Sequence, residues 1–264
     1  MAKVIITGAT GNGELHSVCP GLVRLKLTTG RHSAAGSAVL TAAIASPSIS
    51  QIAVLSRKPP FDTSSKINHI QLPSAEYPKG FDEIPPELVD RLRKDGYESC
   101  IWALGISQTQ VNKEEYVKIT HDYAVTAAKA FSSIGTSEAP FRFVFMSGEG
   151  ARQDEKGYQL FSKVKGKTEK ELFAMKSDKF DVVNIRPGGI IPSPEHRERM
   201  GIFMGQGFRA MGAIFRPIWP SMIIDSPDLG VACVGLAQGK GWDQRDAEGV
   251  INNPKLRQMA QDWV

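Results

Sequence analysis

The sequence predicts an α/β fold: a doubly wound parallel sheet with helices on both faces and a small C-terminal substrate or lid region. A short apolar stretch near the start ends in a glycine turn, and stretches of strand length then alternate with stretches of helical period. Such alternation is typical of parallel strands joined by right-handed crossovers. The length of 264 residues, with 41% apolar residues, fits a single domain over residues 1–264.

Strands and helices can be assigned in order along the chain. Strands are expected within 3–11 and at 51–56, 67–72, 99–104, 141–146 and 180–185, where apolar residues concentrate. Helices are expected at 34–44, 87–94, 112–133, 158–176, 228–238 and 253–263. The helix at 112–133 has the clearest apolar period, from Tyr116 to Phe131. His121 and Asp122 within it are interpreted as a pair on the helix surface.

A glycine motif joins the first strand to the first helix. Residues 3–11 read K-V-I-I-T-G-A-T-G and residues 34–44 read A-A-G-S-A-V-L-T-A-A-I, which together form T-G-x-T-G-x-x-G. Glycines permit a tight turn and a close approach to a diphosphate, and a helix start presents free N–H groups. We therefore expect Gly8, Thr10, Gly11 and Gly36 to bind a dinucleotide.

An insertion, residues 12–34 in the glycine loop, separates the two halves of this motif. Two interpretations are open: a surface excursion of the protein, or translated intron sequence. The codons of residues 13–14, 27–28 and 34–35 can hold splice signals, and excision would leave T-G-A-T-G-N-A-G-S-A-V-L. An insertion that belongs to the mature protein would interrupt the phosphate loop. Sequencing the mature transcript distinguishes the two interpretations.

Two further segments are expected to bind the cofactor. Arg57 and Lys58 follow the second strand, where an acidic side chain would select NAD; two cations instead suit the 2′-phosphate of NADP. A solvated loop pair is the alternative. Ala103, Leu104 and Gly105 end the fourth strand, where small residues allow the cofactor to approach closely, although Gly105 could also serve only the turn.

Residues 190–225 follow the last central strand and are rich in Met, Phe and Trp. A substrate lid, a helix pressed on a membrane or partner, and ordinary core helices all fit this composition.

The catalytic pattern is incomplete. A nicotinamide-dependent reductase of this architecture uses a serine after the fifth strand, and a tyrosine followed four residues later by a lysine on the next helix. Lys165 stands at the lysine position, but Phe161 stands where the tyrosine is expected. Ser147 follows the fifth strand, with Gly148 next to it. Ser147, Lys165 and Tyr158 are therefore the candidate catalytic residues.

Charge, cysteine spacing and hydropathy argue against a nucleic-acid-binding, metal-binding or membrane-spanning protein. The net charge of +4 is spread along the chain, so no nucleic-acid partner is expected. The three cysteines, at 19, 100 and 233, lack metal-ligand spacing and indicate reduced thiols. No apolar run reaches the ~18 residues that a transmembrane helix needs. The first strand follows Met1 too closely for a targeting peptide, so we expect a cytoplasmic protein that binds a small molecule.

The chain resembles the atypical short-chain dehydrogenases/reductases, a branch of the NAD(P)-binding Rossmann-fold superfamily. The matching segments are T-G-A-T-G (7–11), A-L-G-I-S (103–107), E-Y-V-K-I-T-H-D-Y (115–123), M-S-G-E-G-A (146–151), V-K-G-K-T-E-K (164–170) and I-R-P-G-G (185–189). The resemblance is to members near the Tat-interacting-protein oxidoreductases and a fungal mitochondrial-outer-membrane family.

This resemblance implies NADP as the cofactor, with NAD less favoured. It implies cofactor roles for Gly8, Gly11, Arg57, Lys165 and Pro187, to which we add Arg186 and Gly188 of the same segment. It also implies peripheral attachment to the mitochondrial outer membrane as an alternative location. Three departures from the family pattern stand out: the insertion, Phe161 for a tyrosine and Gly148 for a serine.

Three functions follow as hypotheses. The first is NADPH-dependent reduction of a small carbonyl compound by a degenerate active site, with Lys165 holding the ribose and Ser147 polarising the substrate oxygen. The second is a non-catalytic NADP-sensing or scaffold protein, motivated by the missing tyrosine. The third is nucleotide-sugar epimerisation, which ranks last because it needs the same tyrosine.

Overall fold

The central feature of the structure, a computed structural model that describes residues 1–10, 34–195 and 218–263, is a seven-stranded parallel sheet. The strands are β1 (Ala2–Thr7), β2 (Ile49–Ser56), β3 (Ile67–Gln71), β4 (Ser99–Trp102), β5 (Phe141–Met146), β6 (Phe180–Arg186) and β9 (Val250–Asn252). Their order in the sheet is β3-β2-β1-β4-β5-β6-β9, and every neighbouring pair is parallel. The predicted doubly wound parallel sheet is confirmed.

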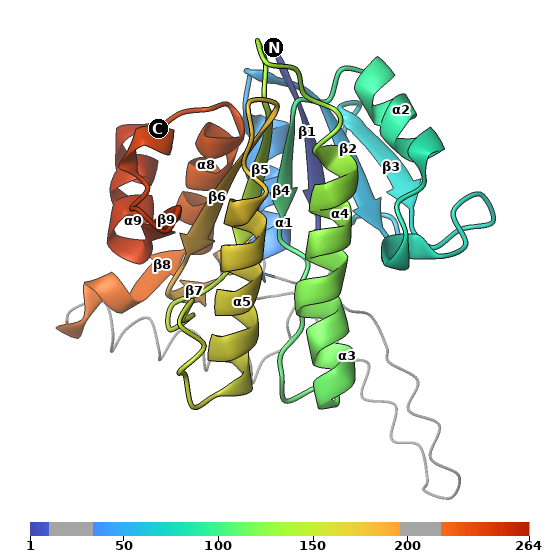
Figure 1. The fold of residues 1–264 in the computed structure, drawn as a ribbon. Helices are drawn as coiled ribbons and strands as arrows, with labels where there is room; N and C mark the ends of the chain where they lie inside the picture. Colours follow the sequence, from blue (N-terminus) through green and yellow to red (C-terminus); the bar gives the residue numbers. More distant parts are fainter. Residues whose placement is uncertain (11–33, 196–217, 264) are drawn as a thin grey trace, which may run out of the picture.

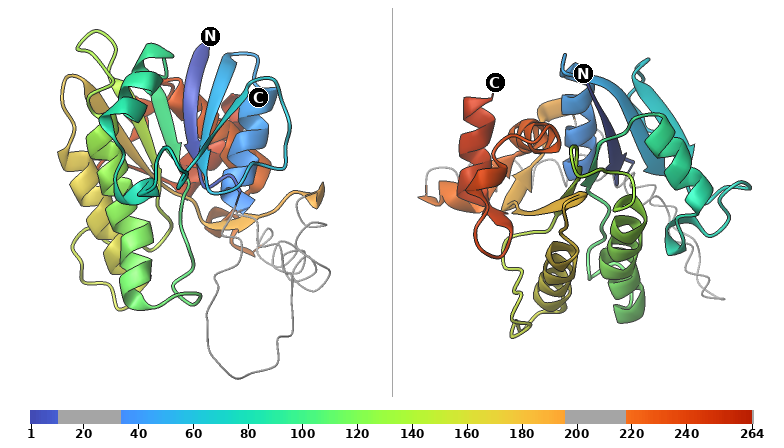
Figure 2. Two further views of the ribbon diagram at one scale, coloured as in Figure 1. Left: turned by 90° about the vertical axis from the view of Figure 1, so that its right-hand side faces the viewer. Right: turned by 45° about the horizontal axis from the view of Figure 1, so that its top comes forward.

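Helices cover both faces of the sheet (Figures 1 and 2). The helices on one face are α1 (Ala34–Ala45), α8 (Ser226–Ala237) and α9 (Asn253–Asp262). Those on the other face are α2 (Pro86–Lys94), α4 (Tyr123–Phe131) and α5 (Leu160–Ala174). Because the central strands β1, β4 and β5 are buried on both faces, their residues are mostly apolar, whereas the edge strand β3 is half-exposed and largely polar. In β1, for example, Val4 and Ile6 pack toward α1 and α8, whereas Ile5 packs toward the opposite face.

The first strand and the first helix meet at two glycines. A Cβ added to Gly36, in the first turn of α1, would lie 2.1 Å from the carbonyl oxygen of Gly8. Gly8 itself has a φ of +75°, which favours glycine, and a Cβ there would lie 2.3 Å from the carbonyl oxygen of Ala103. The Ser37 hydroxyl also donates to the Ala9 carbonyl oxygen at 3.0 Å. The two glycines therefore meet in space although the insertion separates them in sequence.

A widened turn interrupts the long helix predicted at 112–133. It is divided into α3 (Lys113–Val117), a π-helical turn η2 (Lys118–Asp122) and α4. Asn112 caps its start, its side chain accepting from the backbone N–H of Glu115 at 2.8 Å. The turn directs His121 inward, where it is 8% exposed and bonds both Asp122, at 2.7 Å, and Glu171 of α5, at 3.0 Å. The predicted surface pair is thus a buried imidazole beside an exposed carboxylate.

The sequence prediction missed three short strands: β9, β7 (Gly189–Ile191) and β8 (Ile223–Asp225). The last two pair with each other in a separate two-stranded parallel sheet below α8 (Figure 1). They are the described ends of the predicted lid region 190–225, of which 196–217 lie outside the described residues.

Within the described ranges, no helix combines the length and hydropathy needed to cross a bilayer.

Replacing Gly36 with alanine tests the glycine contact. Alanine normally stabilises a helix by about 1 kcal/mol relative to glycine, but here its Cβ would collide with the Gly8 carbonyl. We expect Gly36→Ala to lower the free energy of unfolding by about 2 kcal/mol, measured by urea denaturation. Thr41→Ala, an exposed change on the same helix, should stay within about 0.5 kcal/mol of the parent protein. A Gly36→Ala variant as stable as the parent would contradict the contact.

Candidate functional site

The candidate site lies at the carboxyl ends of the strands, where the chain order of the sheet reverses between β1 and β4. Such a switch point is where open α/β sheets bind ligands. Two cavities of about 280 and 300 Å³ lie there, and Leu104 and Ile106 line both. We name them the β2-side cavity and the β5-side cavity. The two cavities therefore adjoin at Leu104 and Ile106.

The β2-side cavity contains four predicted cofactor residues: Gly8, Thr10, Arg57 and Leu104. Its remaining wall comes from β2, from the segment 72–82, from the segment after β4 and from the helix 113–131, and comprises Leu55, Ser56, Leu72, Pro73, Pro78, Lys79, Gly80, Phe81, Asp82, Ile106, Glu115, Ile119 and Tyr123. Its lining combines aromatic and aliphatic side chains with two cations, Arg57 and Lys79, and two carboxylates, Asp82 and Glu115. Of the two cations, Arg57 directly follows β2.

The β5-side cavity gathers six predicted residues: Ala103, Leu104, Gly105, Ser147, Lys165 and Pro187. The others that line it are Ala35, Ile106, Ser107, Gln110, Tyr116, Met146, Phe161 and Ile190. They come from the first turn of α1, the end of β4, α3, the end of β5, α5 and the segment after β6. The fold therefore brings together residues that lie up to about 150 positions apart in the sequence.

Lys165 is the buried cation of this cavity. Its side chain is on α5, is 8% exposed and donates from Nζ to the carbonyl oxygen of Met146 at 2.8 Å. Nζ also lies 4.8 Å from the centre of the Phe145 ring. Burial lowers the pKa of the Lys165 ammonium to about 8 from the ordinary 10.5, and the Glu169 carboxylate one turn further along α5 opposes this shift.

The residue that follows β5, Ser147, carries a buried hydroxyl. Ser147 is 8% exposed, and its Oγ has no hydrogen-bond partner among the described residues. A buried polar atom without a partner is costly in a folded protein, and at a functional site it indicates a group that a ligand satisfies. Ser147 also lines the β5-side cavity, so an oxygen bound there could complete its hydrogen bonding.

Phe161 and Gly148, the two departures from the family pattern, touch each other. A Cβ added to Gly148 would lie 2.9 Å from Cζ of Phe161, the carbon that carries the hydroxyl in a tyrosine. The backbone N–H of Phe161 donates to Oε1 of Gln108 at 2.9 Å, which fixes the start of α5. The Phe161 ring thus packs against the backbone of Gly148, and neither residue has a side chain that can donate a proton.

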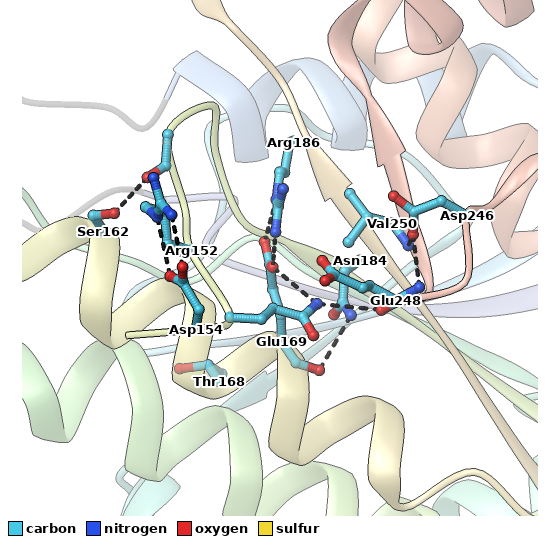
Figure 3. A network of polar contacts seen from close by, with 12 residues as sticks. Arg152, Asp154, Ser162, Thr168, Glu169, Asn184, Arg186, Asp246, Glu248 and Val250 are labelled. Atoms are coloured by element: carbon cyan, nitrogen blue, oxygen red, sulfur yellow. Dashed lines mark hydrogen bonds and ion pairs between the residues drawn. The ribbon is translucent and has the colours of Figure 1, made fainter. Parts of the chain in front are cut away.

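Behind the cavity, Glu169 organises a buried polar network (Figure 3). Glu169 is fully buried and accepts from Nε and Nη2 of Arg186 at 2.9 and 2.6 Å. Asn184 donates to its backbone oxygen at 3.2 Å and Gln153 to its carboxylate at 3.3 Å. The bond to Glu169 raises the pKa of the Arg186 guanidinium. Arg186, predicted to bind the cofactor, is the counterion of this carboxylate and lines neither cavity.

The remaining predicted residues lie outside the two cavities. Tyr158 is fully exposed, and Lys58 is exposed in a turn where the Ser56 hydroxyl donates to its carbonyl oxygen at 2.7 Å. Gly188 donates to the Asn253 side chain at 2.8 Å and packs against the backbone of Met222. Gly36 lies behind Gly8, and Gly11 is outside the described residues.

Sequence reasoning missed several cavity residues. Tyr116 was assigned to the apolar face of its helix, yet it lines the β5-side cavity while only 1% exposed. Phe81 and Tyr123 line the other cavity. A side chain of an amphipathic helix can face a core or a cavity with the same spacing, so the period alone could not identify them.

In the part of the chain that the structure describes, no cluster of three or more metal-ligating side chains exists.

Comparison with curated proteins gives partial matches, and no protein-family model matches the chain. Leucinostatins biosynthesis cluster protein T of Purpureocillium lilacinum is 29% identical over 162 residues, covering 61% of this chain and 55% of that protein. Protein FMP52, mitochondrial, of Kluyveromyces lactis is 27% identical over 154 residues, covering 56% and 63%. The chain thus matches less than two thirds of the length of either relative.

Solved structures match along most of the chain. A short-chain dehydrogenase of Burkholderia cenocepacia in complex with NADP has a TM-score of 0.56 at 14% identity, covering 98% of this chain and 91% of that one. A 3-oxoacyl-[acyl-carrier protein] reductase of Brucella melitensis has 0.59 at 13%, covering 96% of each. UDP-glucose 4-epimerase of Thermotoga maritima has 0.56 at 11%, covering 88% and 72%. The chain therefore has the Rossmann-like fold of the short-chain dehydrogenases and their epimerase relatives.

The buried ammonium makes a prediction about stability. Since the unfolded chain holds this proton more tightly, folding is penalised below about pH 8, and the penalty disappears as the pH rises toward 10.5. The shift corresponds to about 3 kcal/mol, and the lost bond to Met146 costs about 1 kcal/mol. We expect Lys165→Met to raise the free energy of unfolding at pH 7 by about 2 kcal/mol.

Urea denaturation between pH 7 and 10 checks this expectation, because the gain should shrink above pH 8. Lys163→Met, an exposed change on the same helix, should have no effect beyond about 0.5 kcal/mol. A gain that does not depend on pH would contradict the assignment of the effect to the ammonium.

Proposed function

We propose that the chain binds NADP along the carboxyl edge of the sheet and uses its reduced form to reduce a small carbonyl compound. The observation that carries this proposal is the pair of adjoining cavities at the switch point. A dinucleotide consists of two nucleosides joined by a diphosphate, and two cavities that share a wall suit its two halves. The similar short-chain dehydrogenase of Burkholderia cenocepacia forms a complex with NADP, which supports this choice of ligand.

The diphosphate would lie between the cavities, at the start of α1. Ala35, in the first turn of α1, lines the β5-side cavity, and Gly8 and Thr10, in the turn after β1, line the β2-side cavity. The first N–H groups of a helix lack partners within it and favour an anion. The close contact of Gly36 with Gly8 holds this helix end near β1. The chain would therefore bind the diphosphate mainly through its backbone.

The adenosine half would occupy the β2-side cavity. Arg57 lines this cavity at the end of β2, where an acidic residue would be needed to accept from an unphosphorylated ribose. A guanidinium can donate two parallel hydrogen bonds to a phosphate. This position supports a preference for NADP over NAD.

The nicotinamide half would occupy the β5-side cavity, where the bound reduced cofactor would supply a hydride. Ala103 and Gly105 leave room for a ring to approach the end of β4. Lys165 would donate to the ribose, and the Ser147 hydroxyl would donate to the carbonyl oxygen of the substrate. Donation to that oxygen stabilises the negative charge that develops on it during reduction.

A second candidate function is NADP binding without turnover. The contact between Phe161 and Gly148 favours it, because the two positions that would carry the hydroxyls of an acid and its partner carry neither. Under this alternative the chain would bind the dinucleotide with the same residues and respond to its occupancy. NADPH binding combined with no consumption over a broad panel of aldehydes and ketones would favour this function.

Replacing Arg57 tests the choice of dinucleotide. We expect Arg57→Ala to weaken NADPH binding about tenfold, because a charge-assisted hydrogen bond to phosphate is lost, and to change NADH binding less than about twofold. Fluorescence titration with both dinucleotides measures this. Lys58→Ala is the matched control, since Lys58 is exposed and lines neither cavity. Equal weakening of both dinucleotides would contradict recognition of the 2′-phosphate, and a parent chain that binds neither would overturn the proposed function.

Restoring the tyrosine tests the chemistry. The hydroxyl of a Phe161→Tyr variant would extend from Cζ, the ring carbon that faces Gly148, beside Ser147 and Lys165. We expect the kcat for carbonyl reduction to rise at least about tenfold, because a general acid is gained, while the Kd for NADPH stays unchanged. NADPH oxidation followed at 340 nm measures the first quantity. Unchanged kcat in a variant that still binds NADPH would contradict a reductase with a degenerate site.

A further inference from the structure

The cavity proposed to hold the nicotinamide has few groups that can donate a proton. Phe161 presents only carbon, and Tyr158 is fully exposed and lines neither cavity. Reduction of a carbonyl group nevertheless requires a proton for the oxygen. Two of the described residues that line the cavity, Lys165 and Tyr116, carry a proton that is more acidic than that of a serine hydroxyl.

The ammonium of Lys165 is positioned to donate into the cavity. An ammonium has three N–H donors, and the described residues accept one hydrogen bond from it, at the Met146 carbonyl oxygen. A Cβ added to Gly105, on the opposite wall, would lie 4.0 Å from Nζ. Nζ of Lys165 therefore lies close to the ends of both β4 and β5, and two of its three N–H donors are not used by the described residues.

The surroundings of Lys165 make its proton easier to release. The Phe145 ring and the cavity wall replace water around Nζ, and this burial lowers its pKa to about 8. Glu169 opposes the shift from α5, but Arg186 of β6 already neutralises that carboxylate. Tyr116 of α3 is the other titratable group facing the cavity, and burial raises the pKa of its phenol. Near neutral pH the ammonium is thus the better acid.

We propose that Lys165, besides holding the ribose, is the proton donor of this site and takes the role left by the absent tyrosine. The inference rests on the proposed function. The bound reduced dinucleotide would supply the hydride for a new C–H bond at the carbonyl carbon, and the π-electron pair would move to the oxygen. That oxygen takes a proton from Nζ, whose N–H electrons remain on nitrogen. The dinucleotide is oxidised, the carbonyl compound becomes an alcohol, and the neutral amine regains a proton from water.

The pH dependence of turnover distinguishes the two acids. With Lys165 as donor, kcat for reduction should fall tenfold per pH unit above about pH 8, the range in which the ammonium deprotonates. Lys165→Arg keeps the positive charge and the N–H donors, but a guanidinium does not release its proton. We expect this variant to bind NADPH within about threefold of the parent and to lose at least about 100-fold in kcat. Lys163→Gln, on the exposed side of α5, should match the parent in both.

A readout independent of activity is the pH dependence of Lys165 acetylation by acetic anhydride, measured by peptide mass spectrometry on the folded chain. The proposal expects half-maximal reactivity near pH 8 at Lys165. Half-maximal reactivity above pH 10, or a kcat that stays constant up to pH 10, would overturn it. Loss of turnover in Tyr116→Phe but not in Lys165→Arg would also overturn it and assign the proton to Tyr116. Failure of the parent chain to bind NADPH, measured separately by fluorescence, would instead overturn the proposed function itself.

Discussion

The backbone contact between Gly8 and Gly36 is the constraint on which the rest of the site depends. Any side chain at either position would push β1, α1 and the end of β4 apart, because each missing Cβ lies within 2.5 Å of a backbone carbonyl oxygen. Close contact places the start of α1 at the sheet edge where the strand order reverses. Gly8 lines the β2-side cavity, and Ala35, next to Gly36, lines the β5-side cavity. The close contact of the two glycines, which lack a Cβ, therefore sets the relative position of the two cavities.

The helix α5 combines a buried cation and a buried anion one turn apart. Glu169 is balanced by the guanidinium of Arg186, whereas Lys165 has only a carbonyl oxygen and an aromatic ring beside it among the described residues. Burying a charge without a full counterion is unfavourable for folding. The same imbalance makes the ammonium a stronger acid and a donor with unused hydrogen-bonding capacity. Stability and chemistry thus oppose each other at Lys165.

The sequence predicted the sheet well because its central strands are continuous apolar stretches, but β9 has only three residues and leaves no such pattern. The residues gathered at the ends of β4 and β5, including Ser147 and Lys165, were predictable because parallel strands end at one edge. Arg186 was not, since its partner Glu169 lies 17 positions earlier and only the folded structure pairs them. Tyr116 shares the spacing of its buried neighbours, so its contact with the cavity depends on tertiary packing.

The π-helical turn η2 has a mechanical consequence for the site. It turns His121 toward α5, where the imidazole bonds Glu171, so the helix that carries Tyr116 is fastened to the helix that carries Lys165. α3 lies beside α5 (Figure 1), and Tyr116 and Lys165 both line the β5-side cavity. The His121–Glu171 hydrogen bond links the two helices, so any movement that separates them would have to break it.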